Sequence, residues 1–505
     1  MNKKVILIGF HNAKALGVRY LAVSARAHGY DPYVVFFKGF NSLVPEHATD
    51  TELKLLQDFI KAHDPLLVGI SAMSSLYIET LDKVNAAVRA VTSAPIVWGG
   101  VLSTLDPAMA LRYADFILRA EGELPLIDVL QRLEAGGSVK DIDNVGYLDE
   151  EGRMVLNPVR APELDIDKFG YPPVGGPNMF LIANDKIVEG DPQVHAFTYE
   201  LSASRGCPFT CTYCSSINLH RLYMGKGKYV RFRSVDSIMQ ELNEAKAKIP
   251  KLRVIHFWDE IFSNEPGWVN EFCERYPKEI GMPFRIWGHP LMVNQELITK
   301  LTRAGLYSVV MGIQSGSPHI RKDIFHRNET QDQILNAARV LSDCKVPHVS
   351  YDLMLCHKFE TEDTLRESFE LAMALQPPFE LNLHGLNYLP GTDIVEMSIQ
   401  AGHYTREEMQ QLMYSSLQEQ YDRHWGPAAS AYRQASAGNL WTSLIYLAQF
   451  PKLRPRLREL AEQIGDPRAQ KEIFALEVKM KKRQRIVHLI NKVKLVLRMN
   501  PDMGD

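Results

Sequence analysis

The stretch Gly206-Cys207-Pro208-Phe209-Thr210-Cys211-Thr212-Tyr213-Cys214 holds three of the six cysteines of the chain, in the spacing Cys-x3-Cys-x2-Cys. Three thiolates this close in sequence can converge on one metal centre. A structural zinc site needs a fourth ligand, and no further cysteine stands at zinc spacing. A [4Fe–4S] cluster held by three thiolates leaves one iron open for an outside ligand. The stretch therefore predicts an iron–sulfur site that can carry chemistry.

Length and composition set the outer limits of the interpretation. A chain of 505 residues predicts two to four domains, and a formal net charge of −3 gives no basic excess for a nucleic-acid partner. Clustered cysteines favour a reducing compartment. The start of the chain shows no secretory signal, and no apolar run reaches the ~18 residues that cross a bilayer. We expect a cytoplasmic protein, with Cys273, Cys344 and Cys356 as buried free thiols.

The first 135 residues alternate continuous apolar strands with helical segments, which predicts a Rossmann-like, doubly wound parallel sheet. Ligands on such sheets bind at the carboxyl ends of the strands. The expected strands are Lys4–Gly9, Tyr33–Phe37, Leu66–Ser71, Ile96–Gly99 and Phe116–Ala120. Glycines and small polar residues follow several of them, so backbone can come close to a large flat ligand there.

A second alternation predicts a partial (β/α)6 barrel over residues 196–394, with the cysteines directly after its first strand. Barrel chemistry belongs at the carboxyl ends of the strands. Residues 136–195 are expected to form a linker, because prolines and glycines interrupt them, with a hairpin turn at Glu151-Gly152-Arg153. Residues 395–505 have a helical pattern. The expected barrel strands are Phe197–Ser202, Val254–Trp258, Phe284–Trp287, Ser308–Gly312, His348–Leu355 and Leu381–Leu386.

The cysteine spacing, with Arg205-Gly206 before it and Tyr213 within it, resembles the radical S-adenosylmethionine (SAM) superfamily, as does Pro390-Gly391-Thr392 after the last barrel strand. Residues 1–135 resemble the cobalamin-binding domains fused to such enzymes. The segments that carry this second resemblance are Asn12, Leu16–Ala22, Gly69–Ser71, Trp98–Gly100 with Thr104, and Glu121–Glu123. Together they resemble the cobalamin-dependent (class B type) radical SAM enzymes.

The resemblance implies three sets of site residues. Cluster ligands would be Cys207, Cys211 and Cys214. SAM contacts would come from Tyr213, Asp259, Glu260, Gln314, Ser315, Asp352 and Leu389. Cobalamin contacts would come from His11, Asn12, Gly17, Val18, Ser71, Met73, Gly99, Gly100, Val101, Glu121 and Glu123.

Two departures from the family pattern affect this assignment. Residues 9–14 lack the Asp-x-His-x-x-Gly motif of domains that ligate cobalt through histidine, so His11 is either a cobalt ligand or a polar loop histidine. Gln314 stands where the family has a glutamate; its amide can hydrogen-bond ribose or the SAM carboxylate but carries no charge.

The resemblance implies a methyltransferase that uses the cluster to cleave SAM to a 5′-deoxyadenosyl radical and methylcobalamin to methylate an unactivated carbon. Alternatives are a cyclase or rearrangement enzyme acting on a tetrapyrrole or another natural product, and a cobalamin or redox sensor. The expected partners are an external electron donor and a small-molecule, lipid or peptide substrate.

The end of the chain has an unusual charge pattern. Residues 479–498 contain eight Lys or Arg and no acidic residue, interleaved with aliphatic side chains. Such a basic amphipathic helix can lie on an anionic membrane surface. It is more often typical of a solvated terminal helix that packs one face on the protein, and a nucleic acid or a partner protein could also bind it.

Overall fold

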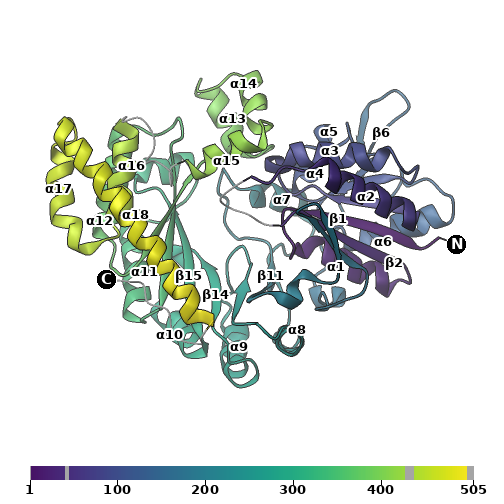
Figure 1. Cartoon of the computed structure of the whole chain (residues 1–505), viewed down its shortest axis with the longest axis horizontal. Coiled ribbons are helices and arrows are strands. Elements are labelled where there is room, and N and C mark those ends of the chain that lie inside the picture. The colour runs from purple at the N-terminus through teal and green to yellow at the C-terminus, as the bar shows by residue number, and fades with distance from the viewer. Residues whose placement is uncertain (1, 40–44, 427–436, 497–505) are drawn as a thin grey trace.

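The protein, here a computed structural model, is described over residues 2–39, 45–426 and 437–496. Two α/β units stand beside each other, and the last helices of the chain lie on the far side of the second unit (Figure 1). The last residues of the expected basic helix, 497 and 498, lie outside the described residues. No helix within those ranges is long and apolar enough to cross a bilayer.

The first unit is built on a nine-stranded sheet in the order β7-β6-β5-β4-β3-β1-β2-β8-β9. The strands β1, β2, β3, β4, β5 and β8 run parallel, while β6, β7 and β9 pair antiparallel at the edges. The central order 5-4-3-1-2 reverses direction between β3 and β1, which is the switch point where such sheets bind ligands. Its strands are β1 Lys4–Phe10, β2 Asp31–Phe37, β3 Leu67–Ser71, β4 Ile96–Gly99, β5 Phe116–Leu118, β6 Val145–Leu148, β7 Met154–Leu156, β8 Met179–Ala183 and β9 Lys186–Glu189.

Six helices accompany these strands, and the burial of the strands explains their continuous apolar sequence. Two separate cores form, one on each face of the sheet. Strand β1 contributes Ile6 and Ile8 to one core and Val5 and Leu7 to the other. The helices are α1 Leu16–Ala27, α2 Asp50–His63, α3 Ile78–Arg89, α4 Val101–Leu105, α5 Pro107–Ala110 and α6 Glu123–Glu134.

Residues 136–195 do more than connect the two units. They supply four strands, β6 to β9, to the two edges of the first sheet. The expected turn at residues 151–153 joins β6 to β7. In sequence this segment resembles a linker because its strands are short and half-exposed, and its prolines and glycines lie between them.

The second unit is an open barrel whose six strands follow the order β10-β13-β14-β15-β16-β17, all parallel. This confirms the predicted fold class. The strands are β10 Thr198–Leu201, β13 Val254–Phe257, β14 Phe284–Gly288, β15 Leu306–Gln314, β16 His348–Leu355 and β17 Glu380–Gly385, with a small ribbon of β11 Ser204–Arg205 and β12 Arg231–Phe232. The helices are α7 Ser215–Tyr223, α8 Val235–Lys248, α9 Pro266–Glu279, α10 Gln295–Ala304, α11 Gln331–Asp343 and α12 Glu362–Ala374.

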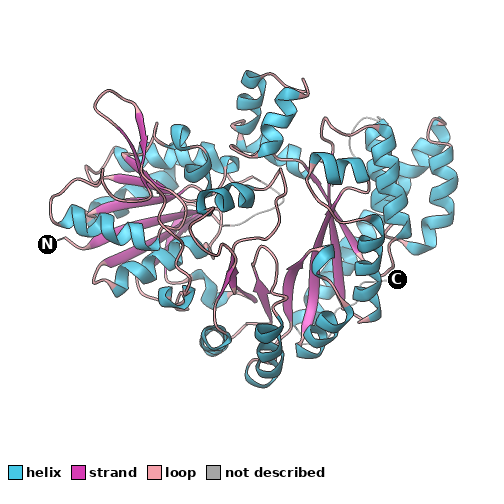
Figure 2. Ribbon diagram, turned by 180° about the vertical axis from the view of Figure 1, so that it is seen from behind, coloured by secondary structure: helices cyan, strands magenta, loops and turns pink. Residues whose placement is uncertain are grey.

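The C-terminal region is helical, as expected. One group reaches over the top of the barrel toward the first unit, and a second group packs against the outside of α12 (Figures 1 and 2). The first group is α13 Asp393–Gln400, α14 Arg406–Met413 and α15 Leu417–Trp425; the second is α16 Ala437–Leu447, α17 Arg454–Glu462 and α18 Pro467–Val496.

The three cysteines outside the motif form no disulfide among the described residues, but they differ in burial. Cys273 and Cys344 are half-buried, and Cys356 is exposed. The expectation of a buried thiol is therefore wrong for Cys356. This residue follows the last residue of β16 with φ +62°, at the point where the strand leaves the sheet.

Candidate active site between the two units

The cysteine loop is held from three sides. Gly206 adopts φ +90°, and a Cβ there would lie 2.6 Å from the carbonyl oxygen of Tyr229, so this turn requires glycine. The Thr212 hydroxyl donates to the carbonyl of Ile324 at 2.6 Å, and its backbone carbonyl accepts from Ile394 at 3.1 Å. The loop that would carry the cluster is therefore fixed before any cluster binds.

Two of the three thiols lie in surroundings that disfavour their charged form unless a cation is present. Burial raises the pKa of Cys207 and of Cys214 to about 12, and the carboxyl group of Glu260 adds to the effect. Within the described residues, no three Cys, His, Asp or Glu side chains converge tightly enough to hold a single metal ion. A cluster with three separate irons to ligate needs no such convergence, and its positive charge would favour the thiolates. Cys214 also caps the N-terminus of α7, whose dipole favours negative sulfur.

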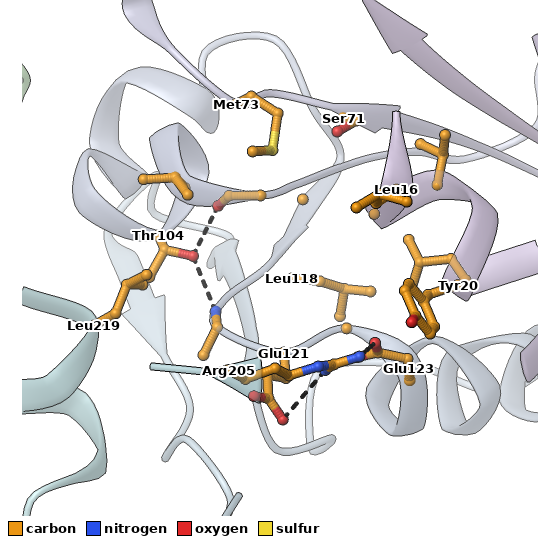
Figure 3. A pocket seen from close by; sticks show the side chains of 18 of the residues that line it. Leu16, Tyr20, Ser71, Met73, Thr104, Leu118, Glu121, Glu123, Arg205 and Leu219 are labelled. Carbon is orange, nitrogen blue, oxygen red and sulfur yellow. Dashed lines mark hydrogen bonds and ion pairs between the residues drawn. The ribbon is translucent and has the colours of Figure 1, made fainter. Parts of the chain in front are cut away.

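A cavity of about 380 Å³ lies between the units and is lined by both. The first sheet contributes Leu7 of β1 and the ends of β3, β4 and β5. The barrel contributes Gly206 next to the first cysteine, together with Trp258 and Glu260. Figure 3 shows the side of the cavity around Ser71, Met73 and Leu118. The cavity therefore sits at the switch point of the first sheet and beside the cysteine loop of the barrel.

The first-sheet wall of this cavity is a backbone cradle suited to a broad, flat ligand. A Cβ added to Gly17 would meet no atom within 4 Å, so this position faces open space. Gly100 adopts φ +104°, and a Cβ there would lie 2.8 Å from the carbonyl oxygen of Ala72. Nine of the residues expected to contact cobalamin line the cavity: Gly17, Val18, Ser71, Met73, Gly99, Gly100, Val101, Glu121 and Glu123. Their presence in one wall fits the corrin that the resemblance implies.

His11 and Asn12 do not line this cavity. His11 has φ +48°, which turns its ring onto Tyr77 at 4.5 Å between centroids, and its Nε2 lies 3.1 Å from the Thr80 hydroxyl. Burial lowers the pKa of His11 to about 4. Asn12 accepts from the backbone N–H of Lys14 and shapes the loop. The geometry therefore favours a loop histidine over a cobalt ligand.

A set of ion pairs joins the first unit to the cysteine loop, and sequence reasoning missed its basic half. Arg205 donates to Glu123 at 2.6 Å and lies 3.6 Å from Glu121 (Figure 3). Arg231 also pairs with Glu121, and the Tyr223 hydroxyl accepts from the backbone N–H of Glu121 at 3.1 Å. These carboxylates pair with basic side chains of the second unit as well as lining the cavity.

The two acidic side chains that follow β13 lie in different surroundings. Asp259 is buried and accepts from the Ala203 N–H at 3.2 Å and from the Ser204 hydroxyl, and burial raises its pKa to about 6. Glu260 reaches the cavity, and desolvation raises its pKa too. Glu260 is thus free to accept from a ligand ammonium, whereas Asp259 holds the turn that precedes the cysteines.

Three further expected SAM contacts lie at or after the ends of two other strands, β15 and β17. Gln314 sits at a bulge of β15 with φ +70°, and its amide lies against Gly312. Ser315 is turned away into the packing of α12, with its hydroxyl 3.4 Å from that of Ser368. Leu389 offers a backbone carbonyl that already accepts from Thr392. Of these residues, Gln314 is the one that the geometry leaves at the barrel mouth.

Tyr213 belongs to a buried network rather than to the cavity. Its hydroxyl accepts from Arg327 at 3.1 Å, and Arg327 also pairs with Glu329 at 2.6 Å and donates to the Gly312 carbonyl at 2.7 Å. The network ties the cysteine loop to the end of β15. Asp352, the last expected contact, lies inside the barrel and accepts from Asn382 at 2.8 Å.

Comparison with known families accounts for this arrangement. The model of the radical SAM superfamily matches residues 201–372, and that of the B12 binding domain matches residues 11–130, so together they cover more than half of the chain. The chain belongs to the cobalamin-dependent radical SAM enzymes. Its cofactors are therefore a [4Fe–4S] cluster, SAM and cobalamin.

Two curated relatives differ in the reaction they are named for. An uncharacterized methyltransferase of Pyrococcus horikoshii is 25% identical over 70% of this chain and 73% of its own length. The anaerobic magnesium-protoporphyrin IX monomethyl ester cyclase of Rubrivivax gelatinosus is 23% identical over 71% of this chain, which spans 62% of the cyclase.

Solved cobalamin-dependent radical SAM structures share the fold. The methyltransferase TsrM of Kitasatospora setae aligns with a TM-score of 0.64 at 16% identity, over 79% of this chain and 76% of its own. The enzyme OxsB aligns with a TM-score of 0.61 at 15% identity, over 100% of this chain and 77% of its own. At these identities the likeness establishes the fold of both units.

Proposed function

We propose that this radical SAM enzyme is a methyltransferase that places a methyl group on a carbon of a small-molecule substrate. The observation that carries the proposal is the shared cavity, in which the glycine cradle of the first sheet and the cysteine loop of the barrel face one space. When bound, the cluster and SAM supply a hydrogen-abstracting radical, and cobalamin supplies a methyl group.

The residues of the chain have defined tasks in this proposal. Cys207, Cys211 and Cys214 hold the cluster on a loop fixed by Thr212. Glu260 accepts from the ammonium of SAM at the mouth of the barrel. The ion pairs of Arg205 hold the glycine-lined wall of the first sheet in a fixed position relative to the barrel mouth. Both cofactors can then reach the same substrate carbon.

Incubation with methyl-labelled SAM, a reductant, cobalamin and cell extract tests the proposal. We expect label in a new carbon–methyl bond together with 5′-deoxyadenosine. Cys211→Ala should lose the iron–sulfur absorbance and both products. Formation of 5′-deoxyadenosine with no transfer of label would contradict methyl transfer.

The second candidate keeps both cofactors but closes or rearranges a ring. The similarity to the magnesium-protoporphyrin cyclase favours it over other non-methylating reactions. A new unlabelled product in the same incubation would identify this reaction. A sensor that only reports its redox state would cleave no SAM at all.

The proposal also includes contact with an anionic membrane surface through α18, cytoplasmic location and an external electron donor. One face of α18 packs on the barrel, where His488 pairs with Glu380 at 2.8 Å. The opposite side exposes an apolar stripe formed by Ile486, Leu489, Ile490 and Val493. Its spacing i, i+3, i+4, i+7 is that of one helix face, and the basic residues around it match an anionic surface.

A further inference from the structure

The lumen of the barrel is lined by polar and charged side chains. On β14, Phe284 and Ile286 belong to the core beneath the helices, so the alternate residues Arg285 and Trp287 face the lumen. The same alternation directs a further set inward from the neighbouring strands. These are Glu200, His256, Asp352, Asn382 and His384.

Arg285 is the cation of this lumen that lacks a partner. Among the described residues its guanidinium makes no ion pair or side-chain hydrogen bond, and its Nε is buried without an acceptor. It lies 5.5 Å from the ring centre of Trp287. The nearby carboxylates are already engaged, because Glu200 accepts from Lys14 at 2.7 Å and Asp352 accepts from Asn382 at 2.8 Å.

An arginine in this condition is unusual for this protein. Four of the five arginines that are buried among the described residues pair with carboxylates: Arg19 with Asp191, Arg231 with Glu121, Arg233 with Glu241 and Arg327 with Glu329. The fifth, Arg321, donates to the backbone carbonyl of Ser315 at 2.7 Å. Burial lowers the pKa of Arg285, as expected for a charge that is costly to desolvate. Arg285 is half-buried, and a charge held in an enzyme barrel without an ion-pair partner is a candidate for ligand binding.

Solvent reaches part of the lumen. His384 and Asp352 point inward, yet their side chains keep 21% and 16% of their exposure. Trp258, one strand away at the mouth, is 47% exposed. In the sheet register, Arg285 of β14 lies opposite His256 of β13. His256 is three residues before Asp259, which lies just beyond the end of β13. At ~3.3 Å per residue, Arg285 therefore lies about 10 Å below the mouth.

The wall beyond Asp352 offers neutral groups. His384 stacks on His424 with 4.9 Å between ring centres, and burial lowers the pKa of each to about 4. The end of α15 can bring His424 this close because residue 385 is glycine: a Cβ there would lie 1.9 Å from the carbonyl oxygen of Arg423. The Nδ1 atoms of both imidazoles are buried and without partners.

We propose that Arg285 binds an oxyanion of the substrate, a carboxylate or phosphoryl group, inside the barrel lumen. The guanidinium fork is suited to two parallel hydrogen bonds with such a group. The neutral imidazoles of His384 and His424 then contact an uncharged part of the same molecule. With its anion about 10 Å below the mouth, the substrate presents its opposite end to the cofactors. The inference rests on the proposed function, because that function makes the bound molecule a substrate. The binding test described next does not depend on it.

The test is calorimetric binding of three probes to the holoenzyme: phenylacetate, phenylphosphonate and neutral phenylacetamide. We expect at least one anion to bind at least tenfold more tightly than the amide. Arg285→Gln should abolish this preference, and Arg285→Lys should retain part of it. Arg303→Gln, which removes an exposed arginine from α10, is the matched control and should bind as the wild type does. Preference for phenylacetate identifies a carboxylate substrate, and preference for phenylphosphonate a phosphoryl substrate.

Three results would overturn the inference: equal binding of the amide, unchanged anion preference in Arg285→Gln, or no binding of either anion. Iron–sulfur absorbance and thermal unfolding confirm that each variant is folded and loaded. Because the readout is binding alone, a failure of methyl transfer leaves the result intact. A failure of anion binding likewise leaves the proposed reaction untouched.

Discussion

At the scale of single residues, the spacing of the cysteines identifies the chemistry, but the contacts of most other site residues depend on the fold. Gly17 is an example of a residue whose role becomes clear only in the folded structure. It lies in the first turn of α1, where alanine is ordinarily favoured by about 1 kcal/mol over glycine, yet it faces the open cavity.

Gly17→Phe should therefore weaken cobalamin retention strongly while leaving the free energy of unfolding within about 1 kcal/mol of the wild type. A Cβ at this position meets no atom within 4 Å, so the ring would extend from there into the space that the corrin needs. Corrin absorbance after desalting, paired with thermal unfolding of the apoprotein, measures both effects. Gly465→Phe, at another glycine with no atom near its Cβ position, should keep its cobalamin. Full retention in Gly17→Phe would place the corrin elsewhere.

At the scale of elements, long periodic segments are predictable and short edge strands are not. The strand expected over His348–Leu355 matches the structure residue for residue, since it has a strong apolar pattern. The strands β6 to β9 have three to five residues each and partly exposed faces, so their sequence resembles a linker. The ion pairs of Arg205 have no local signal, because both partners come from distant segments.

The element that tests membrane contact is α18. Leu489 is 64% exposed at the centre of the apolar stripe, so Leu489→Asp should reduce co-sedimentation with phosphatidylglycerol vesicles at least fivefold. Binding should fall as salt rises and be weak on phosphatidylcholine, since each basic residue near an anionic surface contributes about 1 kcal/mol. Val188→Asp on β9 changes an equally exposed apolar side chain away from the helix and serves as the control. Equal binding of the wild type and Leu489→Asp would rule out the stripe as the contact.

At the scale of the whole molecule, catalysis requires two units to present their cofactors to one carbon. The domain limits expected from sequence, near residues 135, 195 and 394, stay a proposal. The joint between the units could not be predicted from sequence, because its residues come together only when both units have folded. The pairs of Arg205 with Glu121 and Glu123 lie at that joint, one residue from Gly206 and on the edge of the cavity.

Arg205→Gln should therefore lower the ratio of methylated product to 5′-deoxyadenosine, by about tenfold or more, while cluster and cobalamin still bind. A misplacement of about 1 Å at a reacting centre is enough for a loss of that size. Glu123→Gln should have a similar effect, and the double variant should lose little beyond either single one, because the two residues act as one pair. Arg160→Gln breaks an ion pair with Asp128 inside the first unit and should leave the ratio unchanged. If Arg205→Gln instead lowers both products equally, the pair supports radical formation itself and not the alignment of the two units.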